Sequence, residues 1–223
     1  MKVKIFGIFL IIAFCAVSVR GQNLKNEVDS LSYAFGILFG KNIQSGGFQT
    51  INADIFAQAI QKVLQNEVQE MTPEQANTII NIQYMKNQKL KSEKNLQDGR
   101  AFLNINGTAP GVVTLPSGLQ YKVLTMGTGD KPTATDKVTV HYQGALLNGT
   151  VFDSSIQRNQ PSEFPVNGVI AGWTEALQLM PVGSKWILFI PSELAYGETQ
   201  RQGSPIEPNS VLIFEVELIS INN

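Results

Sequence analysis

Side chains capable of covalent or metal chemistry are scarce in this chain of 223 residues. It contains one cysteine, Cys15, and one histidine, His141. A zinc site built from Cys and His needs several such ligands, and a disulfide within the chain needs two cysteines. The segment Gly127-Thr-Gly129 lacks the Lys-Ser/Thr pair and the helix that follow a phosphate-binding loop. We therefore expect no metal site, no bound cofactor and no catalytic cysteine.

The other residues of chemical interest are aromatic and lie in the second half of the chain. Five of them stand out, namely Tyr142, Phe152, Trp173, Tyr196 and Phe214. Asp153 directly follows one of these rings, and the Asp-Ser-Ser sequence that it begins also suits a turn. In most β-rich domains large aromatic side chains are simply part of the core. Residue types alone thus leave a packed core and an aromatic pocket as alternatives.

The elements that must position these rings are predicted to be strands. Residues 111–223 hold 8 prolines and 11 glycines between short β-branched and aromatic runs, which indicates many turns. Val138, Val140 and Tyr142 alternate onto one face of a strand, so His141 on the other face is a structural or surface residue. A short helix containing Trp173 is expected within residues 170–179. The pattern predicts an α+β domain, an antiparallel sheet packed on one short helix.

Residues 22–110 instead predict an all-α region of three helices, over residues 25–41, 53–65 and 72–104. Asn52 is the expected N-cap of the second helix. Thr72-Pro73-Glu74-Gln75 has the form of a capping box with proline in the first turn. Lysines dominate the third helix between residues 86 and 98. We interpret that stretch as a solvated connecting shaft in preference to a basic patch that binds a partner.

The first two helices carry apolar stripes that they cannot bury in each other, because about 15 residues each enclose little core. A second copy of the chain would cover them, so we predict a homodimer through residues 22–70. The candidate interface side chains are Val28, Phe35, Phe39, Phe56 and Ile60.

The N-terminus has the pattern of an export signal. Lys2 and Lys4 precede an apolar run over residues 5–19, which is shorter than the roughly 20 residues that span a bilayer. We expect residues 1–21 to be a cleaved signal peptide, with an uncleaved anchor as the alternative. The formal net charge of −1 argues against nucleic acid or an anionic membrane as a partner, and we expect no stable membrane insertion after cleavage.

Six short motifs in order carry a family resemblance. They are Ser117-Gly-Leu-Gln-Tyr121, Val140-His-Tyr-Gln-Gly144, Gly149-Thr-Val-Phe-Asp-Ser-Ser155, Val169-Ile-Ala-Gly-Trp173, Ala195-Tyr-Gly197 and Leu212-Ile-Phe-Glu-Val216. Together they resemble FKBP-type peptidyl-prolyl cis-trans isomerases over residues 114–221. The segment Ser32-Tyr-Ala-Phe-Gly-Ile-Leu-Phe-Gly-Lys41 is similar to the dimerisation domain of the macrophage infectivity potentiator group of bacterial FKBPs. This resemblance implies a periplasmic location, with outer-membrane or surface association as alternatives.

The resemblance implies an enzyme that rotates X-Pro bonds of unfolded or folding polypeptides without covalent or metal chemistry. The domains would then be the signal peptide at 1–21, the dimerisation region at 22–110 and the isomerase domain at 111–223. The main alternative is a non-catalytic dimeric holdase chaperone that binds unfolded clients. A purely structural dimer is a third possibility and would make the pocket constellation accidental.

The resemblance also assigns roles to residues. The implied catalytic set is Tyr142, Phe152, Asp153, Trp173, Tyr196 and Phe214, and the implied substrate-binding set is Val169, Ile170, Arg158 and Ile206. According to the resemblance, Trp173 forms the floor under the substrate's proline ring. The backbone N–H of Ile170 and the hydroxyl of Tyr196 donate hydrogen bonds to the substrate. Asp153 is held by Tyr142 or Arg158. A groove-edge position that is commonly aromatic in the family aligns with Ser162. The loop over residues 198–207 contains no histidine, and these departures should weaken macrolide binding.

Overall fold

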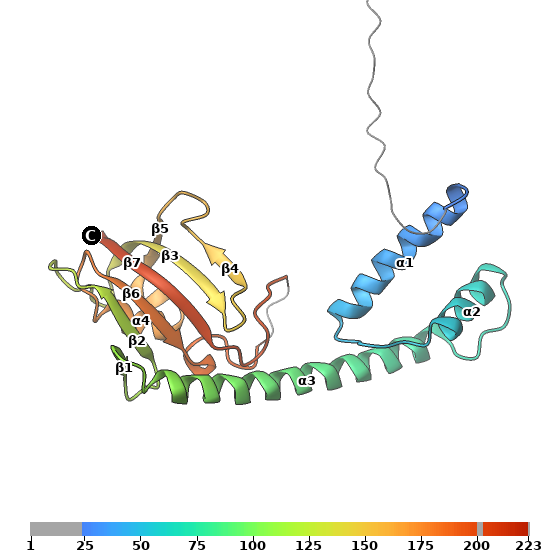
Figure 1. Ribbon diagram of the computed structural model, residues 1–223, viewed down its shortest axis with the longest axis horizontal. Helices are drawn as coiled ribbons and strands as arrows, with labels where there is room; N and C mark the ends of the chain where they lie inside the picture. Colours follow the sequence, from blue (N-terminus) through green and yellow to red (C-terminus); the bar gives the residue numbers. More distant parts are fainter. Residues whose placement is uncertain (1–23, 200–202, 223) are drawn as a thin grey trace, which may run out of the picture. The chain divides into compact units, whose positions relative to one another are not determined.

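A computed structural model of the protein describes residues 24–199 and 203–222. The expected signal peptide and Cys15 lie outside the described residues. The described residues fall into two compact units that divide between residues 49 and 50 (Figure 1).

The described part of the first unit is dominated by helix α1, Glu27–Ser45. Asn26 caps it, because its side-chain oxygen accepts a hydrogen bond from the Asp29 N–H at 2.8 Å. The helix ends where Gly46 and Gly47 follow, and Gly47 has φ of 78°. The predicted helix is confirmed, although it begins and ends a few residues later than expected. No residue of α1 is buried in the single chain.

The second unit begins with helices α2, Ala53–Leu64, and α3, Pro73–Asn106. Asn52 caps α2 by accepting hydrogen bonds from the N–H groups of Asp54 and Ile55, both at 3.1 Å. The capping box of α3 is present, with reciprocal hydrogen bonds between Thr72 and Gln75. The 34 residues of α3 give a length on the order of 50 Å at 1.5 Å per residue. Both predicted cap sites are confirmed.

The last third of α3 packs against the β-rich domain. Gly99 is buried, and Phe102 contacts Phe189 with ring centroids 5.9 Å apart. The buried Gln120 side chain donates to the Leu103 carbonyl at 2.8 Å. From Lys91 onward one face of α3 also hydrogen-bonds the domain. The expectation of a solvated shaft is therefore wrong for one face of this part of the helix, where Lys91, Ser92 and Asn95 find partners far away in sequence. On the other side Lys94 and Asp98 are exposed and pair with each other.

In the part of the chain that the structure describes, seven strands form one antiparallel sheet in the order β1-β2-β6-β7-β3-β4, and β5 pairs with the other end of β3. The strands are β1 Val112–Thr114, β2 Gln120–Thr125, β3 Lys137–Leu146, β4 Val151–Ser154, β5 Ser162–Pro165, β6 Lys185–Ile190 and β7 Leu212–Asn222. Helix α4, Ala171–Leu177, lies against one face of this sheet (Figure 1). Two 3₁₀ turns, η1 at Val166–Gly168 and η2 at Ser192–Leu194, complete the elements. The predicted α+β fold is confirmed.

The core lies between the sheet and α4. Alternate residues of β6 and β7 point into it, as the period of 2 in a strand requires. Leu188, Leu212 and Leu218 are fully buried there, and Leu177 and Met180 reach them from α4 and the turn after it. Gly172 allows the close approach of the helix, because a Cβ at that position would lie 2.5 Å from Cγ2 of Ile190.

We expect Gly172→Ala to lower the free energy of unfolding by about 1–3 kcal/mol, the usual cost of forcing extra volume into a packed core. Denaturant unfolding of the full chain measures this. Ala171→Ser adds one atom at the exposed neighbouring position of α4 and should have little effect. Equal stability of the two variants would show that α4 tolerates a wider spacing from β6.

Candidate functional site

A groove of about 670 Å³ opens beside α4 at the aromatic residues of the domain. It is lined by Tyr142, Phe152, Asp153, Phe164, Gly168, Val169, Ile170, Trp173, Tyr196, Gly203, Ser204, Ile206 and Phe214. These residues come from β3, β4, β5, α4, β7 and the segments that join them. One strand or helix alone therefore does not make the site.

Trp173 is the centre of the ring cluster and is only 4% exposed. Its ring meets Tyr142, Phe164 and Phe214 edge to face, with centroids 5.3, 5.9 and 5.2 Å away. Phe152 contacts Phe214 in the same way at 5.4 Å. Such T-shaped pairs add about 0.5–1.5 kcal/mol each beyond the burial of apolar area. The rings therefore brace one another and give the groove a fixed apolar floor.

The backbone of β3 makes room for this cluster at Gly144. A Cβ there would lie 2.6 Å from atoms of both the Phe152 and the Phe214 rings. Gly144 pairs with Phe214 of β7 on one side and with Asp153 of β4 on the other. Gly144, the last residue of the motif that begins at Val140, is therefore needed in the site because a larger residue would clash with the two rings.

A polar group of three residues, Tyr142, Asp153 and Arg158, borders the apolar floor. The Tyr142 hydroxyl donates to Oδ2 of Asp153 at 2.6 Å, and Nη2 of Arg158 donates to the same hydroxyl at 3.0 Å. Nη1 of Arg158 donates to Oδ1 of Asp153 and forms an ion pair with it. The carboxylate is thereby held by two donors while its edge still faces the groove.

This network shifts the ionisation of its members. Burial disfavours the charged form of Asp153, but the hydrogen bonds from Tyr142 and Arg158 and the charge of Arg158 outweigh it, so the pKa of Asp153 is lowered. Burial, followed by the hydrogen bond to Asp153, raises the pKa of Tyr142. The tyrosine therefore remains a neutral donor and the aspartate a charged acceptor at neutral pH.

The structure brings nine of the ten sequence-predicted site residues into the groove lining. The tenth, Arg158, reaches the site through Asp153 and Tyr142. His141 lies away from the groove, and its Nδ1 is 3.1 Å from the Ser155 hydroxyl, as expected of a structural strand residue.

The aromatic groove-edge position is Phe164, which the sequence analysis missed. Ser162 does not line the groove, whereas Phe164 does and packs on Trp173 and Tyr142. The two residues are two positions apart on the short strand β5 and so share a face. The alternation of side chains along a strand is the signal that would have made Phe164, as well as Ser162, a candidate for the groove edge.

Ile170 and Tyr196 stand at opposite borders of the groove with polar groups of interest. Ile170 precedes α4, and its carbonyl accepts from the N–H groups of Trp173 and Thr174. No acceptor among residues 24–199 and 203–222 takes the N–H of Ile170 itself. Tyr196 lies in the turn after η2, where Gly197 has φ of 57° and donates its N–H to the Ser192 carbonyl.

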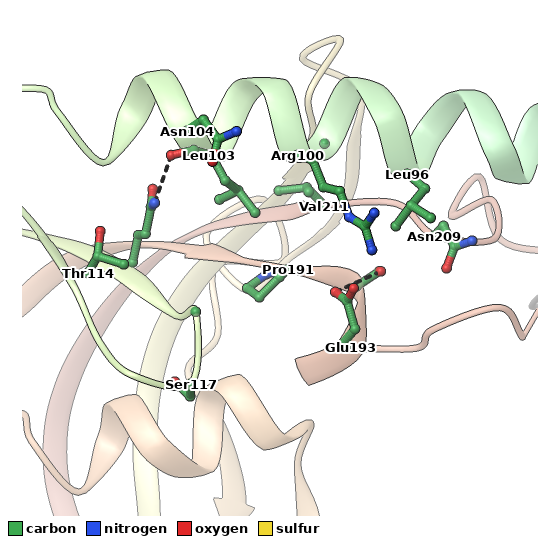
Figure 2. Close-up of a pocket in the computed structure, with 14 residues that line it drawn as sticks. Leu96, Arg100, Leu103, Asn104, Thr114, Ser117, Pro191, Glu193, Asn209 and Val211 are labelled. Atoms are coloured by element: carbon green, nitrogen blue, oxygen red, sulfur yellow. Dashed lines mark hydrogen bonds between the residues drawn. The ribbon is translucent and has the colours of Figure 1, made fainter.

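A second cavity, of about 450 Å³, lies between α3 and the sheet (Figure 2). Arg100 and Asn104 of α3 face Thr114, Pro191 and Glu193 across it (Figure 2). None of its lining residues is aromatic. Its character is therefore unlike that of the groove around Trp173.

Within residues 24–199 and 203–222, no three His, Cys, Asp or Glu side chains gather in a way that could hold a metal ion. No helix in these ranges is long and apolar enough to cross a membrane.

Comparisons with known proteins agree with this architecture. A family model described as FKBP-type peptidyl-prolyl cis-trans isomerase matches residues 128–219, and one described as the domain amino terminal to it matches residues 28–123. The outer membrane protein MIP of Legionella longbeachae is 42% identical, with 99% of this chain and 98% of that protein covered. The peptidyl-prolyl cis-trans isomerase Mip of Coxiella burnetii is 44% identical over 89% of this chain and 88% of that protein.

A solved structure also matches over most of the chain. The crystal structure of FkpA from Escherichia coli superposes with a TM-score of 0.71 at 31% identity, covering 89% of this chain and 98% of that one.

We expect the Asp153 network to make stability pH-dependent in acid. Because the pKa of Asp153 is lowered on folding, its contribution is present above the unfolded value, about 3.9, and is lost as pH falls through the folded value. The free energy of unfolding of Asp153→Asn should therefore vary less with pH below about 4 than that of the parent. Asp130→Asn, at an exposed position, is the control and should keep the parental slope. If the free energy of unfolding of Asp153→Asn varied with pH as steeply as that of the parent, the network would not be the source of the pH dependence.

Proposed function

Because this chain belongs to the FKBP-type peptidyl-prolyl cis-trans isomerases and catalyses rotation about X-Pro bonds, we propose that the groove around Trp173 is its active site. The observation that carries this proposal is the convergence of Tyr142, Phe152, Asp153 and Phe214 with Trp173 on one aromatic floor.

The reaction needs little beyond such a floor. Rotation about an X-Pro bond has a barrier of about 18–20 kcal/mol and takes tens to hundreds of seconds unaided. Twisting the amide removes resonance, so the transition state carries less charge separation than the planar amide. An apolar site that excludes water binds this less polar state better. Lowering the barrier by about 7 kcal/mol would accelerate rotation roughly 10⁵-fold.

Each border of the groove then has a part in holding the substrate. The proline ring rests on Trp173, whose position the surrounding rings fix. The N–H of Ile170 and the hydroxyl of Tyr196 donate to substrate carbonyls that flank the rotating bond. The Asp153 carboxylate, held by Tyr142 and Arg158, keeps the wall formed by Tyr142 in place while the bond turns.

The substrates are proline-containing polypeptides. A groove that only binds clients is not favoured, because the matching family model and the curated relatives are named for the isomerase reaction.

We expect Phe152→Ala to lower kcat/KM for an X-Pro peptide by about 10- to 100-fold, because it removes apolar contact from the groove wall. The measurement is cis/trans isomerisation by residues 22–223, with folding checked by circular dichroism. Tyr121→Ala is the matched control. It removes another half-buried ring, one that stacks on Trp186 outside the groove, and should keep most of the activity. A folded Phe152→Ala variant with parental activity would place catalysis elsewhere.

We also propose that helices α1 and α2, which precede the isomerase domain, form the interface of a homodimer. Val28, Phe35 and Phe39 of α1 are exposed in the single chain, as are Phe56 and Ile60 of α2. Phe35 and Phe39 stack on each other with centroids 6.2 Å apart, so the middle of α1 presents two adjoining aromatic rings. Exposed apolar area of this extent favours association, and the match to the amino-terminal family domain supports it.

We expect Phe35→Asp to convert the dimer into a monomer, because a carboxylate would have to be buried unpaired at the interface. Sedimentation of residues 22–223 measures the change. Leu124→Asp places the same charge at an exposed apolar position of β2 and should leave the dimer intact. A parent chain that sediments as a monomer would overturn the dimer.

We also propose that the protein acts outside the cytoplasm on exported proteins. The pattern of Lys2, Lys4 and the apolar residues 5–19 supports export, and one relative bears the name outer membrane protein. The periplasm is the location we propose. We expect the periplasmic fraction to contain the protein with a mature N-terminus at Gln22, and determining that N-terminus tests the proposal.

A further inference from the structure

One wall of the groove is a segment without regular structure. Residues 203–211 contain neither helix nor strand, yet Gly203, Ser204 and Ile206 line the groove. Ile206 is almost fully buried, and a hydrogen bond from its N–H to the Ser204 hydroxyl is local to the segment. A segment without a strand ladder depends on anchors from elsewhere to hold one position.

Those anchors come from α3, none of whose residues lines the groove. Nδ2 of Asn95 donates to the Pro208 carbonyl at 3.0 Å and lies 3.3 Å from Oε2 of Glu207. Nζ of Lys91 forms an ion pair with Oε1 of the same Glu207 at 2.9 Å. One helix face thus binds two consecutive residues next to Ile206.

Asn209 extends the linkage to the opposite border of the groove. Its side chain donates to the Ser92 hydroxyl of α3 at 2.8 Å, and its N–H donates to the Gly197 carbonyl at 2.7 Å. It is 7% exposed and has φ of 58°, a left-handed conformation that needs such support. Asn209 therefore connects α3 to the turn that carries Tyr196.

Close packing continues the contact beyond these hydrogen bonds. A Cβ at Gly99 would lie 2.7 Å from Cγ2 of Val211, so glycine permits α3 to approach the segment. Leu96 and Arg100 lie over Asn209 and Val211 in the same region (Figure 2). The hydrogen bonds and the packing together bind residues 207–211 along two turns of the helix.

We propose that one face of α3, formed by Lys91, Ser92, Asn95 and Gly99, is a functional part of the isomerase site, with Asn95 and Ser92 as positioning residues for Ile206 and Tyr196. The inference rests on the proposed function, that the groove around Trp173 is where rotation is catalysed. It moves the functional start of the isomerase unit from the expected residue 111 into the helix that precedes it.

Asn95 is the residue to test, because the ion pair of Lys91 with Glu207 is partly exposed and such pairs contribute little. Asn95→Asp keeps the size of the side chain but removes the donor to Pro208 and sets a carboxylate beside Glu207. If Asn95 acted by packing alone, the activity of this variant would be nearly unchanged. If Asn95 acts as a hydrogen-bond donor, the segment that carries Ile206 loses its anchor in this variant.

We expect Asn95→Asp in residues 22–223 to lower kcat/KM for an X-Pro peptide about three- to tenfold. The amide NMR signals of Tyr196 and Ile206 should shift as well. Adding Glu207→Gln should restore part of kcat/KM, because the like charges no longer face each other. Lys94→Ala is the matched control, since Lys94 is on the same helix but pairs with Asp98 and not with residues 203–211.

Two outcomes would overturn the inference while leaving the proposed site intact. One is an unchanged kcat/KM and unchanged Tyr196 and Ile206 signals in Asn95→Asp, while Phe152→Ala still shows its lowered kcat/KM. The other is a lower melting temperature with parental kcat/KM, which would make Asn95 merely structural. Parental activity of Phe152→Ala would instead overturn the proposed site, and the inference with it.

Discussion

The site depends on keeping a large indole ring dry and immobile at the bottom of an open groove. Trp173 achieves this through edge-to-face contacts with three rings from three different strands. The ring cluster requires a close approach of the β3 backbone, which Gly144 permits, and Gly172 lets the helix that carries Trp173 pack closely on Ile190. In the proposed mechanism a floor of this kind favours the twisted, less polar amide, so that catalysis follows from packing and exclusion of water.

The polar groups around this floor hold its walls in place. Tyr142 belongs both to the ring cluster and to the network with Asp153 and Arg158, so one residue ties the apolar floor to the charged border. Asp153 and Arg158 are 43% and 50% exposed, and their ion pair contributes geometry more than stability. Ile206 and Tyr196 complete the borders from segments whose conformation is fixed through Asn209.

Helix α3 thus has two tasks in this chain. Its capped first turn follows the helices whose exposed rings support dimerisation, and its later turns contact the segment that walls the groove. A client held at the groove would bear on the same segment that contacts the helix. The connection between the helical region and the isomerase domain is therefore a packed and hydrogen-bonded interface from Lys91 onward.

Local patterns in the sequence determined much of this protein. Asn52 and Thr72 marked the starts of their helices, the alternation along β7 separated core from surface, and the motif residues met in the groove as the family resemblance implied. These features depend on a few neighbouring residues. Only the tertiary structure showed that Phe164 borders the groove, why Gly144 must lack a side chain, and that Asn95 binds Pro208. Their partners lie on other elements, 113 residues away for Asn95, and no local periodicity encodes which distant backbone will pack against a polar helix face.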